Sequence, residues 1–375
     1  MSRSISMQGQ DLNIGRQRNG SNHEGFEKRE KRRNIRQLQV AISQGDIELV
    51  KRILISDFDV DFQYNGQTSL QLAVCQGLPE ICTLLISKGA NVNQTNADGN
   101  SLLNMACWRG FAEVAVLLVN NGADINSRNE SGNTSLNACA YKGFSNIAEI
   151  LLSAKCDINL HNEEGQTPLY SASRTGNATM VHQLLKAGAD PDWGDLTRKT
   201  PLMTAAAEGH VEVVRALLEG GASVNEQSQQ GRTAVFEAAI SGHNEILQEL
   251  IKYKADLNLA TIKGFTPLIE AISHNHIASA TALIEADCDV NLADRTHWAP
   301  IHAAIRQVSS TFDPDNNSVS DVVVALVTAG ADVNKCDAEN WTPLYQAASA
   351  GDLEICNYLL KKGAAVDSVT KHGSS

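Results

Sequence analysis

Eight cysteines are the residues of this 375-residue chain best suited to bind a metal or to act as nucleophiles. No two of them form a Cys-x-x-Cys pair, and their spacing matches no zinc-binding pattern. Free cysteine also packs as a small apolar side chain and is often buried. We therefore interpret these cysteines as buried free thiols of a protein in a reducing compartment. They are Cys75, Cys82, Cys107, Cys139, Cys156, Cys288, Cys336 and Cys356.

Four histidines between residues 274 and 302 raise the same question of a metal site. His274 and His276 are two residues apart, and side chains at that spacing do not share a face of a helix. His297 and His302 fall at positions that the repeat described below explains. The sequence contains no phosphate-binding glycine loop, no nucleophile elbow and no His-Glu-x-x-His motif. It therefore predicts no catalytic residue, no metal and no cofactor, and a protein that is not an enzyme.

The composition narrows the class of partner. Hydrophobic residues are 42% and charged residues 20% of the chain, as in a folded protein. The net charge of −12 argues against nucleic acid or an anionic membrane as the partner. No apolar run reaches the roughly 18 residues of a membrane span, and the N-terminus lacks the apolar stretch of a secretory signal. We expect a cytoplasmic monomer that binds a protein or peptide and does not insert into membranes.

The N-terminal tail differs from the rest of the chain. Residues 1–36 contain nine basic and four acidic residues, and they show no clear apolar period. We interpret residues 1–33 as a disordered basic tail. Its cluster from Lys28 to Arg33 has the composition of a nuclear-import signal, which makes nuclear localisation an alternative. The other interpretation is a solvated charge run that leads into the first helix.

Nine related segments make up most of the chain. Their anchor residues are 33 residues apart in the first seven steps and 43 apart in the last step. A Thr before Pro matches a helix N-cap, and a Gly about nine residues later permits a left-handed turn between two helices. Each segment therefore predicts two short helices joined by a glycine turn. The anchors are Thr68, Ser101, Thr134, Thr167, Thr200, Thr233, Thr266, Ala299 and Thr342.

This pattern resembles a known family of repeats. The 33-residue period, Thr-Pro-Leu at residues 167–169 and Gly-Ala-Asp at residues 188–190 resemble the ankyrin repeat. The resemblance implies an all-α repeat solenoid, in which helix–turn–helix units with β-hairpin loops stack into a curved array. The expected boundaries are a tail over 1–33, a solenoid over 34–367 and a C-terminal tail over 368–375. Within the solenoid, a cap covers 34–63 and repeats start near residues 66, 99, 132, 165, 198, 231, 264, 297 and 340.

Three features depart from the regular repeat. The first unit, from about Ile35 to Asp61, lacks Thr-Pro and carries polar residues that suit a cap. An insertion over residues 308–318 extends the turn between the two helices of the eighth repeat. We interpret it as a tolerated surface loop, with a docking or modification loop as the alternative. We expect the short C-terminal tail to leave no room for the recruitment box of a ubiquitin-ligase subunit.

The resemblance implies that a partner binds on the concave side, at the ends of the inner helices and on the hairpin loops. Five residues at inner-helix positions of repeats two to four form an aromatic and cationic strip: Trp108, Arg109, Tyr141, Lys142 and Arg174. Such groups are typical of binding hot spots for acidic and apolar side chains. The alternative is that they only cover the ends of the helices.

A second cluster lies one residue before the anchors of repeats seven to nine. Phe265, Trp298 and Trp341 are expected to form an aromatic ladder along successive hairpin loops. Tryptophan at an exposed, rigid position is typical of a binding surface. The alternative is that each ring packs on a neighbouring hairpin.

The resemblance also implies one modification. Similar proteins are substrates of an asparaginyl hydroxylase, which acts on the hairpin asparagine. Seven residues occupy that position here: Asn93, Asn126, Asn159, Asn225, Asn258, Asn291 and Asn334.

The function expected from the sequence is that of a non-catalytic scaffold or adaptor. It would bind a protein or peptide partner on the concave surface, and family architecture does not identify that partner. Two alternatives remain open at this point. One is a substrate-recognition subunit of a ubiquitin ligase that lacks its recruitment box in this chain, and the other is a nuclear transcriptional cofactor.

Overall fold

A computed structural model describes residues 32–56, 59–310, 318–367 and 371. Contacts between Cα atoms divide the chain into two compact units, Met1–Ser135 and Leu136–Ser375. Each unit is described by itself below. The predicted tail over 1–33 and most of the insertion over 308–318 lie outside the described residues.

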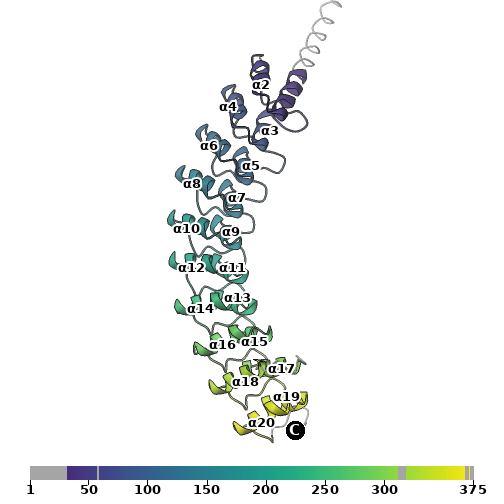
Figure 1. Cartoon of the computed structure of the whole chain (residues 1–375), viewed down its shortest axis with the longest axis vertical. Coiled ribbons are helices and arrows are strands. Elements are labelled where there is room, and N and C mark those ends of the chain that lie inside the picture. The colour runs from purple at the N-terminus through teal and green to yellow at the C-terminus, as the bar shows by residue number, and fades with distance from the viewer. Residues whose placement is uncertain (1–31, 57–58, 311–317, 368–370, 372–375) are drawn as a thin grey trace, which may run out of the picture. The chain divides into compact units, whose positions relative to one another are not determined.

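The N-terminal unit consists of helix pairs. A helix over residues 32–44 is followed by α2, and two further pairs come after it along the chain (Figure 1). In the second and third pairs, α3 packs on α4 and α5 packs on α6. The helices are α2 (Ile47–Ile53), α3 (Ser69–Gln76), α4 (Pro79–Ser87), α5 (Leu102–Arg109) and α6 (Ala112–Asn120).

The C-terminal unit repeats the same pair seven times. Inner helices carry odd numbers and pack on the next inner helix, as α9 does on α11, while outer helices carry even numbers and pack on the next outer helix (Figure 1). The helices are α7 (Ser135–Lys142), α8 (Ser145–Ser153), α9 (Pro168–Arg174), α10 (Ala178–Lys186), α11 (Pro201–Glu208), α12 (Val211–Glu219), α13 (Ala234–Ser241), α14 (Asn244–Lys252), α15 (Pro267–Ser273), α16 (Ile277–Glu285), α17 (Pro300–Ser310), α18 (Ser318–Thr328), α19 (Pro343–Ala350) and α20 (Leu353–Lys361). These repeated pairs confirm the expected all-α fold.

The anchor residues start the inner helices, as the sequence predicts. Thr200 has an extended backbone, and its side chain accepts a hydrogen bond from the N–H of Met203, while Pro201 occupies the first helical position. Ser101 caps α5 in the same way. Ala299 has no hydroxyl, and its own N–H instead donates to Nδ1 of His302 at 3.1 Å. The local sequence therefore fixes where each inner helix begins.

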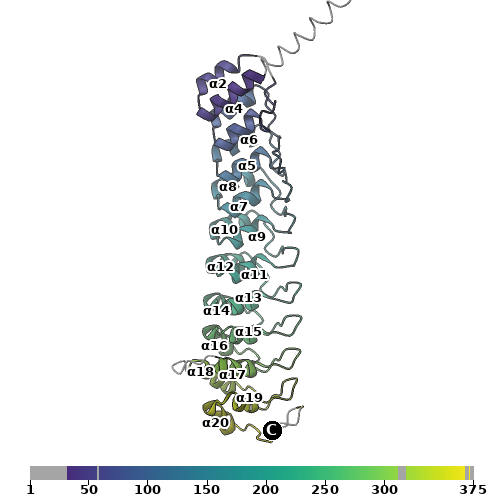
Figure 2. The same cartoon turned by 90° about the vertical axis from the view of Figure 1, so that its right-hand side faces the viewer.

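Within each unit, the loops between repeats project to one side of the helices (Figure 2). In the C-terminal unit, successive loop tips are joined by single backbone hydrogen bonds, such as Leu196 N–H to Glu164 O and Ile262 N–H to Gln230 O. The described residues contain no β-strand. They contain two isolated antiparallel β-bridges, both in the N-terminal unit. The expected β-hairpin loops are thus tight turns. We call them finger loops below.

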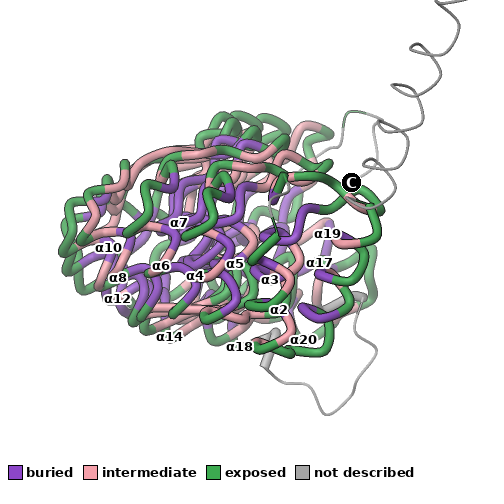
Figure 3. Tube along the Cα trace, turned by 90° about the horizontal axis from the view of Figure 1, so that it is seen from above, coloured by how far each residue is buried: buried purple, intermediate pink, exposed green. Residues whose placement is uncertain are grey.

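Burial is concentrated between the helices. Leu, Ile, Val and Ala at the helix contacts are buried, while the loops are largely exposed (Figure 3). Small side chains such as Ala205 and Ala206 allow neighbouring inner helices to approach closely. Among the described residues, no helix is long and apolar enough to cross a membrane.

Candidate interaction surface

The cysteines and histidines are distributed among the repeats. The described residues contain no group of three or more His, Cys, Asp or Glu that could hold a metal ion. Four of the eight cysteines are buried, as the sequence predicts: Cys82, Cys107, Cys139 and Cys288. The prediction of burial is wrong for Cys336, which is exposed, and three others are only partly buried: Cys75, Cys156 and Cys356. Burial raises the pKa of the Cys288 thiol to about 12, which keeps this thiol protonated and weakly nucleophilic.

The histidines of the repeat have structural partners. His210, which follows a turn glycine, directs Nε2 at the carbonyl of Arg174 at 3.1 Å, and His243 and His276 repeat this contact one and two repeats later. A carbonyl only accepts, so Nε2 carries the proton. His302 is buried and donates from Nε2 to Lys335 O. These residues join successive repeats.

Three residues of the predicted strip come together in the C-terminal unit. Tyr141 and Lys142 end α7, and Arg174 ends α9. The Arg174 guanidinium lies 5.5 Å from the centre of the Tyr141 ring, and Lys142 Nζ lies 5.8 Å from it. The Tyr141 side chain is 42% exposed. An accessible aromatic ring with two adjacent cations can contact an apolar group and an acidic group at once.

The other two residues of the strip lie in the N-terminal unit. Trp108 and Arg109 end α5, the inner helix of the second repeat. Trp108 is 49% exposed, although it is the largest side chain on that helix. Large exposed aromatic side chains on rigid helices are typical of binding surfaces.

The three residues predicted to form an aromatic ladder lie at the bases of three finger loops. Phe265, Trp298 and Trp341 are each partly exposed, and each backbone N–H donates to a side-chain oxygen four residues earlier. The Trp298 ring stacks on His302 at 5.4 Å, and the Trp341 ring meets Tyr345 edge-on at 5.1 Å. These two rings therefore pack on the inner helix of their own repeat, with part of each ring still accessible.

Sequence reasoning missed a charged cluster at the same repeat position as the three aromatic residues, one residue before the anchor. Lys199 and Arg232 occupy the position before the anchor in repeats five and six, where the next three repeats carry the aromatic residues. Between them lies Glu237, a nearly buried carboxylate on α13. Its Oε1 is 3.6 Å from Arg232 and 3.9 Å from Lys199. Comparing the positions before each anchor across repeats would have revealed this row.

A neighbouring carboxylate extends the cluster. Burial raises the pKa of Glu270 on α15, and Coulomb attraction to His274 and Arg232 partly opposes this. Nδ1 of His274 lies 3.4 Å from Glu270 Oε2. The row from repeat five to repeat nine thus changes from charged to aromatic. The ends of the inner helices and the bases of the finger loops carry this row and the Tyr141 cluster. We call this surface the inner face.

The hairpin asparagines link successive repeats. Asn258 Oδ1 accepts from the N–H of Asp289 at 2.8 Å, and its own N–H donates to Asp256 at 2.9 Å. Asn93, Asn159, Asn225, Asn291 and Asn334 accept from the next repeat in the same way. The N–H of Asn126 donates to Asp124. The side chains therefore have a structural role, and their hydroxylation stays a prediction that intact-mass measurement tests.

Comparison with known proteins identifies a family and a partial relative. The family model described as "Ankyrin repeats (3 copies)" matches residues 38–129, 103–195, 136–228, 220–294, 236–313 and 301–375. Over 70 residues the chain is 36% identical to the phosphocholine transferase AnkX of Legionella pneumophila. That match covers 18% of this chain and 7% of the relative's length.

Proposed function

Because the chain belongs to the ankyrin-repeat family, whose repeats mediate protein–protein interaction, we propose that it is a non-catalytic scaffold or adaptor. A partner protein or peptide binds on the inner face. The observation that carries this proposal is the cluster of Tyr141, Lys142 and Arg174, in which two cations at helix ends lie close to an accessible ring. Preformed groups of this kind bind with little loss of conformational entropy.

The row before the anchors supports the same partner chemistry. Lys199 and Arg232 present cations, and Phe265, Trp298 and Trp341 present partly exposed rings further along the unit. A partner with both acidic and apolar side chains complements these groups. Trp108 and Arg109 add the same chemistry within the N-terminal unit.

Affinity purification of variants tests this proposal. The triple change Trp108→Ala, Tyr141→Ala and Arg174→Ala removes two exposed rings and one partly exposed cation. It should therefore abolish capture of the specific partners and leave the unfolding midpoint nearly unchanged. The matched control changes three exposed residues on or next to outer helices: Val116→Ala, Lys186→Ala and Tyr253→Ala. The proposal is wrong if the Trp108/Tyr141/Arg174 triple variant captures the same proteins as wild type. It is also wrong if the control variant loses those proteins to the same extent.

Two alternative roles use the same surface. Recovery of ubiquitin-ligase subunits with wild type would favour the substrate-recognition role, and recovery of transcription factors would favour the nuclear cofactor. For the nuclear role, a fluorescent reporter fused to residues 1–36 should enter the nucleus. A reporter that stays in the cytoplasm leaves the cytoplasmic adaptor as the proposal.

A further inference from the structure

Four residues of the inner face occupy the same position in four successive repeats of the C-terminal unit. Lys199, Arg232, Phe265 and Trp298 each lie one residue before the anchor, in repeats five to eight, and each is partly exposed. The inner helix of each of these repeats packs on the inner helix before it and on the one after it. The exposure of the four residues is therefore a property of the stacked repeats.

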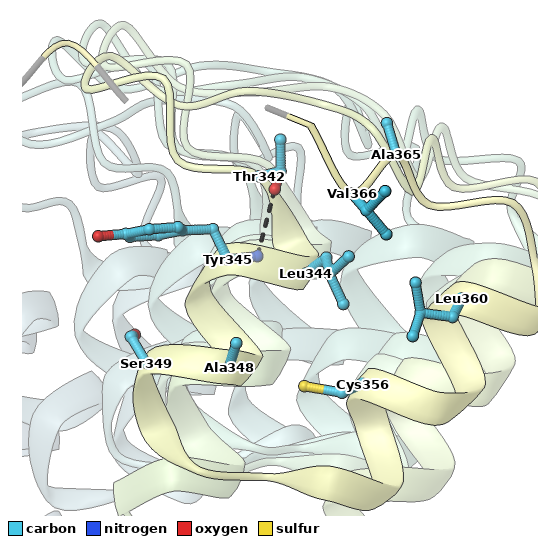
Figure 4. A pocket seen from close by; sticks show the side chains of 9 residues that line it. All are labelled: Thr342, Leu344, Tyr345, Ala348, Ser349, Cys356, Leu360, Ala365 and Val366. Atoms are coloured by element: carbon cyan, nitrogen blue, oxygen red, sulfur yellow. Dashed lines mark hydrogen bonds between the residues drawn. The ribbon is translucent and has the colours of Figure 1, made fainter. Parts of the chain in front are cut away.

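The backbone holds these four residues in equivalent places. The anchor follows each of them, and in repeats five to seven its hydroxyl caps the inner helix. Figure 4 shows the same cap in the ninth repeat, where the Thr342 hydroxyl accepts from the N–H of Tyr345 at 3.2 Å. On the other side, the N–H of each of the four residues donates to a side-chain oxygen four residues earlier, on Asp195, Ser228, Thr261 and Asp294 respectively. Each repeat therefore presents one side chain from the same backbone position.

The spacing of the four residues follows from the packing of the inner helices. α11 packs on α13, α13 packs on α15, and α15 packs on α17. The axes of packed helices lie about 8–10 Å apart, so successive side chains of this series are presented at about that interval. A bound segment that uses neighbouring members of the series must repeat a contact group at the same interval.

Among the regular backbone conformations, polyproline II matches this interval. It rises about 3.1 Å per residue with three residues per turn, so every third side chain points the same way at intervals of about 9 Å. A β-strand presents side chains on one face about every 6.6 Å. An α-helix presents them about every 5.4 Å and reaches about 10.8 Å at its second turn. Grooves lined by aromatic residues are a known receptor for polyproline II segments.

The charged end of the series can receive one acidic group. Lys199 Nζ lies 3.9 Å and Arg232 Nη1 lies 3.6 Å from the same oxygen, Oε1 of Glu237. These contacts are ionic and longer than hydrogen bonds, so both cations keep donors for a ligand. The other carboxylate nearby, on Glu270, lies 3.4 Å from Nδ1 of His274. A carboxylate from a partner can therefore contact both cations together.

We propose that the partner segment on the inner face binds in the polyproline II conformation. Two of its apolar side chains, three residues apart, lie on Phe265 and Trp298, and one acidic side chain lies at Lys199 and Arg232. The two cations belong to the two repeats before that of Phe265, which places the acidic residue about three to five positions from the nearer apolar residue. This inference rests on the proposed function and specifies the conformation and residue pattern of the bound segment.

Selection of binding peptides tests this proposal on the full chain. The probe is a phage-displayed library of random peptides of about 12 residues, which is long enough to span four repeats at three residues each. It is selected on the immobilised protein and, in parallel, on the blocked support alone. Enriched peptides should carry two apolar residues three positions apart, with Asp or Glu about three to five positions from one of them. An enriched apolar spacing of two positions would indicate a strand, a spacing of seven would indicate a helix, and either overturns the proposal.

Variants of the protein assign the contacts of one enriched peptide, synthesised with a fluorescein label and measured by fluorescence anisotropy. Lys199→Ala with Arg232→Ala should weaken binding by about tenfold or more, and replacing the acidic residue of the peptide by its amide should then cause little further loss. Phe265→Ala should couple in the same way to the nearer apolar residue of the peptide. The matched control removes two exposed cations from the outer helices α10 and α20, Lys186→Ala with Lys361→Ala, and should bind as wild type does.

The outcomes separate this inference from the proposed function. Peptides that require Lys199 and Arg232 but show another apolar spacing overturn the polyproline II conformation and still support partner binding on the inner face. Enriched peptides that bind the Lys199/Arg232 double variant as tightly as wild type overturn the inference. So does a lack of enrichment over the blocked support. In those two cases the affinity purification described above decides the proposed function independently.

Discussion

His302 is held in one tautomer by two backbone partners. The Ala299 N–H donates to Nδ1, and Nε2–H donates to Lys335 O in the next repeat. Burial lowers the pKa of His302, and the carboxylate of Asp337 partly opposes that shift. Protonation would place a second donor opposite the Ala299 N–H, so the folded protein favours the neutral ring.

A pH-dependent stability follows from this lowered pKa. An unfolded histidine titrates near pH 6.5, and the folded pKa lies below that value. The contribution of neutral His302 is fully present above about pH 6.5 and is lost as the pH falls through the folded pKa. The urea midpoint of wild type should fall more between pH 7.5 and pH 5 than that of His302→Gln. His182→Gln, at an exposed position of α10, should retain the wild-type dependence, and equal pH dependence in His302→Gln and wild type would contradict this account.

At the residue scale, the sequence predicted the role of single residues better than it predicted which residues contact one another. It assigned His302 to a position of the repeat and Cys107 to the core, because the repeat fixes the position of each residue. It missed the contact of Glu237 with Lys199 and Arg232, since these residues come from two repeats. Such contacts depend on how successive repeats stack. The sequence of a single repeat does not encode the distance between side chains of two repeats.

At the element scale, the glycine turn joins inner and outer helices. Gly209 ends α11 with φ of 82°, and the His243 ring of the next repeat lies directly over it. A Cβ at this position would be 2.8 Å from Cε1 of that ring. The glycine is therefore required twice, by the left-handed backbone and by the packing of the next repeat.

Two glycine substitutions separate these requirements. Gly351 has φ of 77°, and no atom lies within 4 Å of the point that a Cβ would occupy there, so Gly351→Ala measures the cost of the left-handed backbone alone. That cost is about 1–2 kcal/mol. Gly209→Ala should lower the free energy of unfolding by more, because His243 must also move. Equal losses in denaturant unfolding would show that the ring contact contributes nothing.

Helix starts and turns were therefore predictable, and the loops less so. Thr-Pro and the turn glycine act locally, and Asn275, which replaces that glycine in repeat seven, adopts φ of 59° as a residue tolerant of the left-handed region. The finger loops were expected to be hairpins. In the structure they are tight turns. Backbone hydrogen bonds close a loop on itself, as Asp195 N–H to Lys199 O and Arg198 N–H to Asp195 O do, and a further bond joins it to a neighbouring loop.

At the scale of the whole molecule, the period predicted the repeated helix pairs, and the family match confirms the family. The period did not predict the row that changes from charged to aromatic residues across repeats five to nine. This row depends on differences between repeats, which a shared pattern conceals.

Hydrogen–deuterium exchange of the protein with and without a purified partner tests the central claim most directly. Partner binding on the inner face predicts protection at the ends of α7 and α9 and at the bases of the finger loops that carry Lys199, Arg232 and Trp298. Outer helices such as α10 and α14 should exchange at unchanged rates. Protection confined to the outer helices, with none at Tyr141 or Arg174, would contradict the account.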